Sequence, residues 1–341
     1  MKMRLIFLFL FVTLFMVSKL TLALPSSETL KAIQQINEHG PYLGLVVPNA
    51  YEMDPLLQSQ HFKPSKTFPI LDLQGRRFHI GRIHKHGVIV VMSGLSMLNS
   101  GLTTQLLLSF FSVKGIIHFG IAGNADPSLY VGYVTIPQYW AHTGLWNWQR
   151  FGDGPNDELS LEVDGDYTRK LGYLHFTKFT TPSGNSDNLL NNVWYQPEEV
   201  FPTTGTPEVR EHAFWVPVDK HYYQIAKKLE NFTLESCLNA TTCLSHTPKV
   251  LRVEKGSSAN VFVDNGAYRD FIHTKFNITA IDMESAAVAL VCLEQGVPFI
   301  VIRALSDLAG GSSQSNEASV FGGLASQNAA DTTIQFLKLL S

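Results

Sequence analysis

The chain contains 341 residues, of which 45% are hydrophobic, so it can bury a large core. Its formal net charge of -3 at pH 7 argues against nucleic acid or an anionic membrane surface as a partner, and favours a small neutral ligand. No internal repeat or low-complexity tract is evident, which favours an ordinary globular domain.

Residues 1–23 have the pattern of a secretory signal peptide. Lys2 and Arg4 precede an apolar run over residues 5–17, and Thr21-Leu22-Ala23 forms a small-residue cleavage site. The run is too short to span a bilayer comfortably, so we favour cleavage over a membrane anchor. We expect a mature chain of residues 24–341 that enters the secretory pathway, resides in the vacuole or the extracellular space (apoplast), and has no membrane partner after cleavage.

The rest of the chain alternates between strand and helix patterns. Apolar, β-branched runs predict strands at 43–48, 78–83, 87–92, 115–119, 132–137, 250–254, 278–281 and 299–305. Helical patterns predict helices near 26–38, 99–112, 219–230, 264–275, 284–294 and 324–340. This alternation is typical of an α/β domain.

Two acidic residues close a strand–helix–strand unit near the C-terminus. Residues 278–281 and 299–305 are predicted to be buried parallel strands joined by a right-handed helical crossover that ends at Gly296. Glu284 and Asp307 stand just past the ends of these strands. Because open α/β sheets bind ligands at the carboxyl edge, we expect both acids to lie at one site there.

A third acid and a glycine motif follow two earlier strands. Glu52 comes shortly after the strand at 43–48, and Gly120-Ile121-Ala122-Gly123 is expected to form a loop directly after the strand at 115–119. A lone acid in such a place is more often a helix cap, and a lone Gly-x-x-Gly more often a turn. Three acids and one glycine motif at the same edge favour a functional site.

Residues 138–218 interrupt the alternation of strands and helices. They are rich in Trp, Tyr, Pro, Gly and Asn, and they are too long for an ordinary loop in a compact domain. We expect a single domain over residues 24–341 with this stretch as one aromatic-rich insertion, which folds over the sheet edge or builds a subunit interface.

The cysteines and glycosylation sequons agree with a secretory route. Cys237 and Cys243 bracket a polar loop and are predicted to close a short disulfide, the alternative being two unpaired cysteines. Sequons for N-glycosylation begin at Asn231, Asn239 and Asn277, the last of which directly precedes a buried strand. The His and Cys residues show no spacing typical of metal ligands, so no metal site is predicted.

Four stretches, taken in order and spacing, are similar to one known family. They are Met92-Ser93-Gly94-Leu95, Gly120 to Gly123 with Asp126 to Gly132, Asp282-Met283-Glu284, and Arg303-Ala304-Leu305-Ser306-Asp307. They resemble the purine nucleoside phosphorylase and methylthioadenosine nucleosidase superfamily. Residues 139–150 and 212–217 narrow the resemblance to plant bark storage proteins and their cytokinin riboside phosphorylase-like relatives. The resemblance implies a three-layer α/β/α fold with a mixed, largely parallel central sheet, and we expect a homo-oligomer, a dimer or a trimer.

The resemblance also implies roles for residues near the C-terminus. Cleaving the bond between ribose and a purine builds negative charge on the departing base, so an acid must protonate the base. Asp307 matches the family position that donates to the purine N7, Glu284 matches the residue that grips the ribose hydroxyls, and Met283 would pack beneath the sugar. The residues expected at the base are Ser306 and one of Phe262 and Val261 as the stacking partner, with core packing as the alternative for those two.

The attacking group stays open. Glu52 matches the nucleosidase acid that orients a water molecule, which favours hydrolysis. Bacterial phosphorylases of this family hold phosphate through Arg and Ser residues, whereas the matching positions here carry Asn49, Ala50, His118 and Ile121. A phosphate site is therefore absent or rebuilt around His118, Arg82 or a neighbouring subunit. The residues expected around the nucleophile or phosphate are Gly120, Ile121, Gly123 and His118, with inorganic phosphate as co-substrate if phosphate attacks and no other cofactor.

Two functions from different classes follow. The retained acids favour an enzyme that cleaves the N-glycosidic bond of purine ribosides, cytokinin ribosides among them, with a purine nucleoside or base as the small-molecule partner. The plant resemblance favours phosphorolysis over hydrolysis by a small margin. The alternative is a vegetative nitrogen-storage glycoprotein derived from such an enzyme, which the insertion, the secretory route and the sequons favour. We place the enzyme first, because a pure reserve protein needs no catalytic carboxylates.

Overall fold

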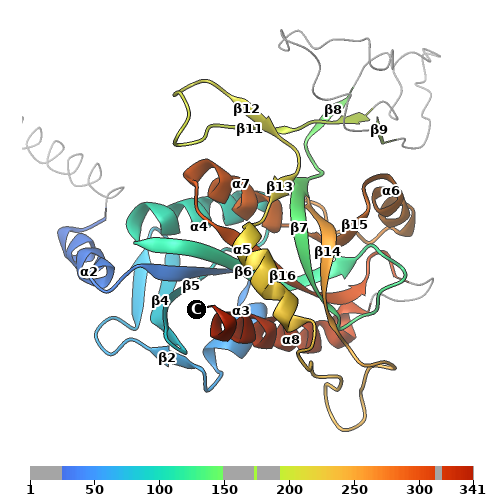
Figure 1. Cartoon of the computed structure of the whole chain (residues 1–341), viewed down its shortest axis with the longest axis horizontal. Coiled ribbons are helices and arrows are strands. Elements are labelled where there is room, and N and C mark those ends of the chain that lie inside the picture. Colours follow the sequence, from blue (N-terminus) through green and yellow to red (C-terminus); the bar gives the residue numbers. More distant parts are fainter. Residues whose placement is uncertain (1–24, 149–172, 175–192, 312–316, 341) are drawn as a thin grey trace, which may run out of the picture.

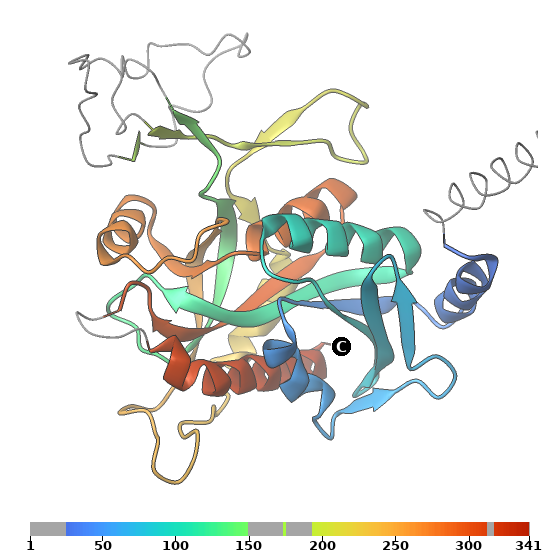
Figure 2. The ribbon, with the colours of Figure 1, turned by 180° about the vertical axis from the view of Figure 1, so that it is seen from behind.

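The computed structural model describes residues 25–148, 173–174, 193–311 and 317–340. Its centre is a mixed sheet of eleven strands with helices on both faces, the fold class expected from the sequence (Figures 1 and 2). The predicted signal peptide at 1–23 lies outside the described residues. In the part of the chain that the structure describes, no helix is long and apolar enough to cross a membrane.

The elements follow the predicted order with several additions. The strands of the large sheet are β1 (Tyr42–Val47), β2 (Phe62–Pro64), β3 (Ile70–Leu73), β4 (Arg76–Ile83), β5 (His86–Met92), β6 (Val113–Asn124), β7 (Val134–His142), β13 (Val216–Pro217), β14 (Val250–Ser258), β15 (Ile278–Asp282) and β16 (Phe299–Leu308). The helices are α2 (Ser27–Asn37), α3 (Ala50–Leu57), α4 (Met97–Phe110), α5 (Lys220–Ala226), the 3-10 helix η3 (Lys227–Leu229), α6 (Gly266–Phe276), α7 (Ser285–Gln295) and α8 (Ala318–Leu339).

Two apolar clusters hold the layers together, one on each face of the sheet. Alternate residues of β1 face opposite sides: Leu43 and Leu45 pack with α3, α5 and α8, whereas Tyr42 and Val46 pack with α2, α4 and α7. Because both faces are covered, all six residues of β1 are buried. This explains why its sequence is a continuous apolar run without polar alternation.

Five strands close on themselves within the large sheet. The pairings run from β7 to β14, to β15, to β6, to β16 and back to β7. In this ring β15 pairs in parallel with β14 but antiparallel with the end of β6, where Ile281 lies opposite Gly123. The prediction of 278–281 and 299–305 as parallel strands is therefore wrong, because β6, which pairs with both, runs parallel to β16 and antiparallel to β15.

The glycine motif at 120–123 is strand and not loop. β6 continues to Asn124, and Gly120 and Gly123 pair with Arg303 and Asp307 of β16. The prediction of a strand ending at 119 was wrong because the glycines weaken the apolar pattern, while pairing with β15 and β16 keeps this segment extended.

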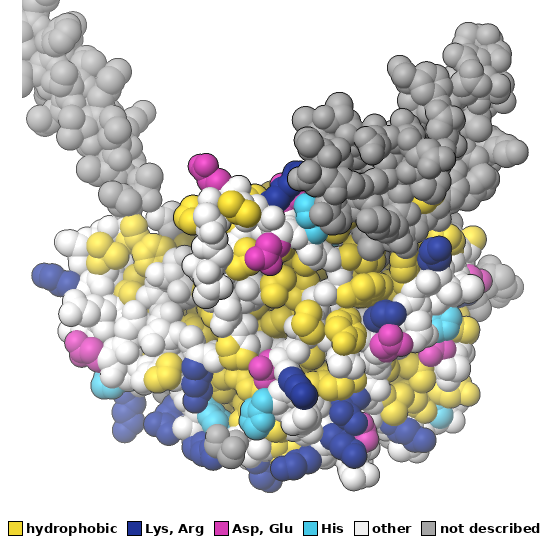
Figure 3. All heavy atoms as spheres, turned by 45° about the horizontal axis from the view of Figure 1, so that its top comes forward, with side chains coloured by type: hydrophobic (Ala, Val, Ile, Leu, Met, Phe, Trp, Pro, Cys, Tyr) yellow, Lys and Arg dark blue, Asp and Glu magenta, His cyan; other side chains and the backbone are white. Residues whose placement is uncertain are grey.

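Part of the predicted insertion also belongs to the sheet. β7 runs to His142 and pairs with β14 as far as Ser258. Beyond it, β8 (Trp146–Trp148), β9 (Tyr173–Leu174) and β10 (Val193–Tyr195) form one small sheet, and β11 (Glu198–Val200) and β12 (Glu211–Ala213) form another. Both small sheets project beyond the main body (Figure 1). One face of the molecule carries hydrophobic side chains over its centre and many Lys and Arg side chains along its lower rim (Figure 3).

Candidate active site

Glu52 enters the site from the first turn of α3. Asn49 caps this helix by accepting a hydrogen bond from the Glu52 N–H, and its Nδ2 donates to Glu52 Oε1 at 2.5 Å. The other oxygen, Oε2, accepts from the backbone N–H of Ile121 at 2.6 Å. Burial raises the pKa of Glu52 to about 7, although Arg303 and the Ile121 N–H both lower it. This carboxylate can therefore exchange a proton near neutral pH.

Arg303 lies in the middle of the network and is fully buried. Each nitrogen of its guanidinium has a partner within 3.1 Å. These are Asp282 Oδ2 (2.7 Å) and Ser285 Oγ (3.1 Å) for Nε, the Ile121 carbonyl (3.0 Å) for Nη1, and His118 Nε2 and Ser285 Oγ (3.0 Å) for Nη2. Two further carboxylates stand slightly farther away, with Glu52 Oε2 3.7 Å from Nη1 and Glu284 Oε2 3.6 Å from Nη2. The guanidinium is thus bound through all three of its nitrogens.

Asp282 is the closest anion to Arg303. Burial acts to raise its pKa, but Arg303 and hydrogen bonds from Ser258 and Ser285 together hold that pKa below its usual value. Its Oδ1 also accepts from the backbone N–H groups of Glu284 and Ser285, at 3.1 and 3.0 Å. Asp282 is therefore an ionised anchor that fixes both Arg303 and the start of α7.

Glu284 stands at the N-terminus of α7 and is 3% exposed. Its Oε1 accepts from the backbone N–H of Ser96, just before α4, at 3.1 Å. Burial raises its pKa against the opposing effect of Arg303. Met283, which precedes it, is half-buried and lines the same cavity.

Asp307 comes near the end of β16, opposite Gly123 of β6, and is 3% exposed. The hydroxyl of Ser306 lies 2.6 Å from Asp307 Oδ1 and 3.3 Å from the Ala122 carbonyl. A shift in the register of β16 at this point places both Ser306 and Asp307 at the cavity.

These residues surround one cavity of about 150 Å³. Of the residues predicted from the sequence, those that line it are Glu52, Ile121, Gly123, Val261, Phe262, Met283, Glu284, Ser306 and Asp307. Phe262 and Val261 are 63% and 46% exposed, so they form its rim and are not part of the core. Glu52, Glu284 and Asp307 lie at or just past the carboxyl ends of β1, β15 and β16, and all three line this one cavity.

Two residues predicted for the nucleophile pocket do not line the cavity. Gly120 lies behind it, where a Cβ would collide with the Glu52 carboxylate. His118 is fully buried, with Nδ1 2.8 Å from the Val46 carbonyl and Nε2 on Arg303. Burial and Arg303 lower the pKa of His118 to about 3, so it is neutral. Arg82 lies exposed on β4 and bonds the Lys85 carbonyl, so neither residue rebuilds a phosphate site at this cavity.

Sequence reasoning missed Arg303 and Asp282 as members of the site. Arg303 interrupts the apolar run of β16, and a charged residue in a buried strand must be paired, so the signal was present. The sequence could not show which buried groups would pair with Arg303. Asp282 was overlooked because Glu284, two positions later, matches the family residue that binds the ribose hydroxyls.

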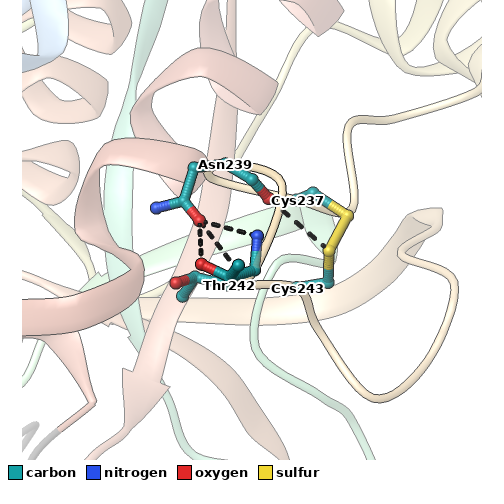
Figure 4. The surroundings of a disulfide bond; sticks show 5 residues. Cys237, Asn239, Thr242 and Cys243 are labelled. Atoms are coloured by element: carbon teal, nitrogen blue, oxygen red, sulfur yellow. Dashed lines mark hydrogen bonds between the residues drawn. A yellow bond between two sulfur atoms is a disulfide. The ribbon is translucent and has the colours of Figure 1, made fainter.

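The predicted disulfide and sequons lie away from this cavity. A disulfide joins Cys237 and Cys243, and within its loop the Asn239 side-chain oxygen accepts from Thr241 and Thr242 (Figure 4). Asn231, Asn239 and Asn277 are exposed. The Nδ2 of Asn277 donates to Glu254 at 2.8 Å. Among the described ranges, no group of three or more His, Cys, Asp or Glu is placed to hold a metal ion.

Comparisons with known proteins give one consistent result. The profile of the family described as "Phosphorylase superfamily" matches residues 42–338. Bark storage protein A of Populus deltoides is 33% identical over 86% of this chain and 88% of its own length. The 5'-methylthioadenosine/S-adenosylhomocysteine nucleosidase of Mycobacterium tuberculosis (strain CDC 1551 / Oshkosh) is 26% identical over 69% of this chain and 75% of its own.

Solved structures share the fold. The corresponding nucleosidase of S. pneumoniae superposes with a TM-score of 0.59 and 20% identity, covering 88% of this chain and all of that one. A Colwellia psychrerythraea nucleosidase of the same kind, solved in complex with adenine, gives the same TM-score and identity over 88% of this chain and 95% of its own.

Proposed function

This chain belongs to the phosphorylase superfamily, and from that premise we propose that it cleaves the N-glycosidic bond of purine ribosides with water as the nucleophile. The observation that carries the proposal is the convergence of Glu52, Glu284 and Asp307 on one cavity. A purine as the departing base is supported by relatives named as nucleosidases of 5'-methylthioadenosine and by the adenine in the Colwellia structure.

Each acid has a position suited to one part of the reaction. Glu284, held by the Ser96 N–H, faces the cavity as an acceptor for ribose hydroxyls. Asp307 donates a proton to the purine as the C–N bond breaks. The water oxygen attacks the sugar carbon, and its proton passes to ionised Glu52, so the products are the free sugar and the neutral base.

Water is preferred to phosphate because of the charge of the cavity. Among its described lining residues none is Lys, Arg or His, while four are acidic: Glu52, Asp282, Glu284 and Asp307. Arg303 is near, but it does not line the cavity, and each nitrogen of its guanidinium already has a partner. A phosphate dianion would enter beside these acidic residues with no cationic lining residue to bind it. The sequence favoured phosphorolysis narrowly, and that preference rests on resemblance alone.

Product analysis tests the proposal directly. Purified protein is incubated with adenosine, inosine or isopentenyladenosine, with and without saturating phosphate, and the sugar products are separated. We expect free ribose and a rate independent of phosphate. Ribose 1-phosphate, with a rate that rises with phosphate, would overturn hydrolysis while preserving glycosidic cleavage.

The second candidate is a storage role, which the identity to the Populus bark storage protein favours. A reserve protein derived from an enzyme would keep the cavity but would have lost the ability to cleave ribosides at an appreciable rate. Binding of adenine without cleavage of any of the three ribosides would support this candidate. Entry into the secretory pathway and N-glycosylation at Asn231, Asn239 and Asn277 remain proposals. The mobility of the secreted protein before and after enzymatic removal of N-glycans tests both.

A further inference from the structure

His118 does not line the cavity, and it makes two contacts that the proposed reaction does not use directly. Its Nδ1 is 2.8 Å from the Val46 carbonyl of β1, and a carbonyl can only accept, so Nδ1 carries the hydrogen. Its Nε2 therefore has a free lone pair, which accepts from Nη2 of Arg303. His118 is thus a neutral acceptor of fixed orientation.

The register of two strands brings this acceptor to the guanidinium. β6 and β16 pair in parallel, with Val301 opposite His118 and Arg303 opposite Gly120. A Cβ at Gly120 would lie 2.6 Å from Arg303 Nη1 and would collide with Glu52. The absence of a side chain at Gly120 therefore leaves the space in which Arg303 lies, between His118 and Glu52.

Several hydrogen-bond acceptors together determine how the Arg303 guanidinium is oriented. Asp282 and Ser285 hold Nε, His118 and Ser285 hold Nη2, and Nη1 faces the Ile121 carbonyl and Glu52. Removing the acceptor at 118 would leave Nη2 hydrogen-bonded to Ser285 Oγ alone. The guanidinium could then turn toward Ser285, which would change the separation of Nη1 and Glu52 Oε2, 3.7 Å in this structure.

The local charge explains why a neutral acceptor suits position 118. The charged and titratable groups that face Arg303 are Glu52 from α3, Asp282 and Glu284 from the β15–α7 junction, and His118 itself. Three carboxylates already oppose one cation, so a fourth would leave more buried negative charge uncompensated. A Lys or Arg at 118 would repel Arg303.

We propose that His118 is a positioning residue, which orients Arg303 and through it sets the proton affinity of Glu52. The proposal deepens the proposed function, because it matters for turnover only if Glu52 activates water. The predicted change is in the protonation midpoint of Glu52, which can be measured without turnover.

Infrared titration of Glu52 tests the proposal. The band of its protonated carboxyl is assigned by difference against Glu52→Gln and followed with pH in wild type, His118→Phe and His118→Gln. Because Arg303 and Glu284 face Glu52 in every variant, a shift reports the orientation of Arg303. We expect the midpoint to rise by about one pH unit in His118→Phe, the lower end of the effect of a close opposite charge. His118→Gln, which retains an acceptor and a donor, should restore the midpoint.

Phe119→Leu is the matched control. Phe119 is equally buried on β6 but faces the opposite side of the sheet, in the cluster with α8. It should lower thermal stability without moving the Glu52 midpoint. If His118→Phe fails to fold, His118→Leu replaces it. An unchanged midpoint in the folded variant would overturn the proposal, since His118 would then serve packing only.

Kinetics on a riboside give a second readout. In His118→Phe we expect kcat to fall about tenfold or more with little change in KM, because Glu52 acts on water and not on the sugar. His118→Gln should recover most of the rate. A rise in KM with unchanged kcat would contradict the proposal. If the wild type cleaves no riboside, the proposed function fails, while the infrared titration still decides the role of His118.

Discussion

The carboxylates of the cavity differ in role because they differ in their immediate partners. Asp282 touches Arg303 directly and stays ionised, whereas Glu52 and Glu284 lie farther from the cation and their pKa values are raised by burial. A buried acid near neutral pKa suits proton transfer, and a permanently ionised one suits anchoring.

Replacing the proposed acid tests its role most simply. Asp307→Asn should keep the fold and the binding of adenine but lower kcat on the order of a hundredfold or more, because an amide has no proton acidic enough for the leaving base. Initial rates and thermal melting of the purified variant measure both effects. Asp72→Asn, at an exposed carboxylate on β3, is the control. A near-wild-type rate for Asp307→Asn would remove this residue from the mechanism.

Glu52 is expected to cost stability at high pH. Because its pKa is raised from 4.5 to about 7, the folded state binds this proton more tightly than the unfolded state does. The stability that this group contributes is full below about pH 4.5 and is lost as pH rises through about 7.

Glu52→Gln, neutral at every pH, should therefore be more stable than wild type at alkaline pH, by up to about 3 kcal/mol, while losing activity. Urea unfolding at a series of pH values measures the difference, which should vanish toward the acidic end. A variant that is destabilised at alkaline pH would show that the ionised carboxylate is held favourably.

At the scale of elements, β6 and β16 organise the site together. β6 supplies Gly120, Ile121 and Gly123, while β16 supplies Arg303, a buried cation that pairs with acids from α3 and the β15–α7 junction. The Arg303 guanidinium therefore contacts α3, β6 and the β15–α7 junction at once.

Arg303→Met should consequently destabilise the whole protein, by about 3–5 kcal/mol, since it leaves buried carboxylates without their cation. The loss should shrink at acidic pH, where these carboxylates take up protons. Denaturant midpoints measure it, with Arg77→Met, whose exposed side chain pairs with Asp72, as the matched control that should change little. Equal effects for the two variants would mean that the Arg303 network is not structural.

At the scale of the whole molecule, the mouth of the cavity adjoins exposed apolar side chains. Leu95, Leu98 and Leu102 are 58%, 69% and 59% exposed, and Leu95 lines the cavity rim together with Phe262. Leu98 and Leu102 share one face of α4, being four residues apart. Contiguous apolar surface of this kind marks an interaction site.

We expect the chain to be a homo-oligomer that the pair Leu98→Glu and Leu102→Glu converts to monomers. Light scattering coupled to size-exclusion chromatography gives the mass of each form. Leu30→Glu, on the exposed face of α2, adds a charge elsewhere and should leave the mass unchanged. A monomeric wild-type chain would contradict the expected oligomer.

Local patterns in the sequence were enough to predict most of the elements and the three acids of the cavity. Apolar β-branched runs predicted the strands because their burial on both faces is a local requirement, and Gly296 ends α7 with a positive φ of 63° as its position suggested. Glu52 and Glu284 could be found because each follows a strand at short range, and Asp307 because it comes near the end of one.

Only the tertiary structure decided the direction of β15, the strand character of the glycine motif, and the partners of Arg303. Arg303 meets His118 across 185 residues and Ile121 across 182. No local pattern encodes which buried acceptor will satisfy a buried donor, because that choice depends on the register of β6 against β16 and on the closure of the ring. The sequence by itself therefore determined which groups can do chemistry, and the long-range strand pairing determined their charge states and their proximity.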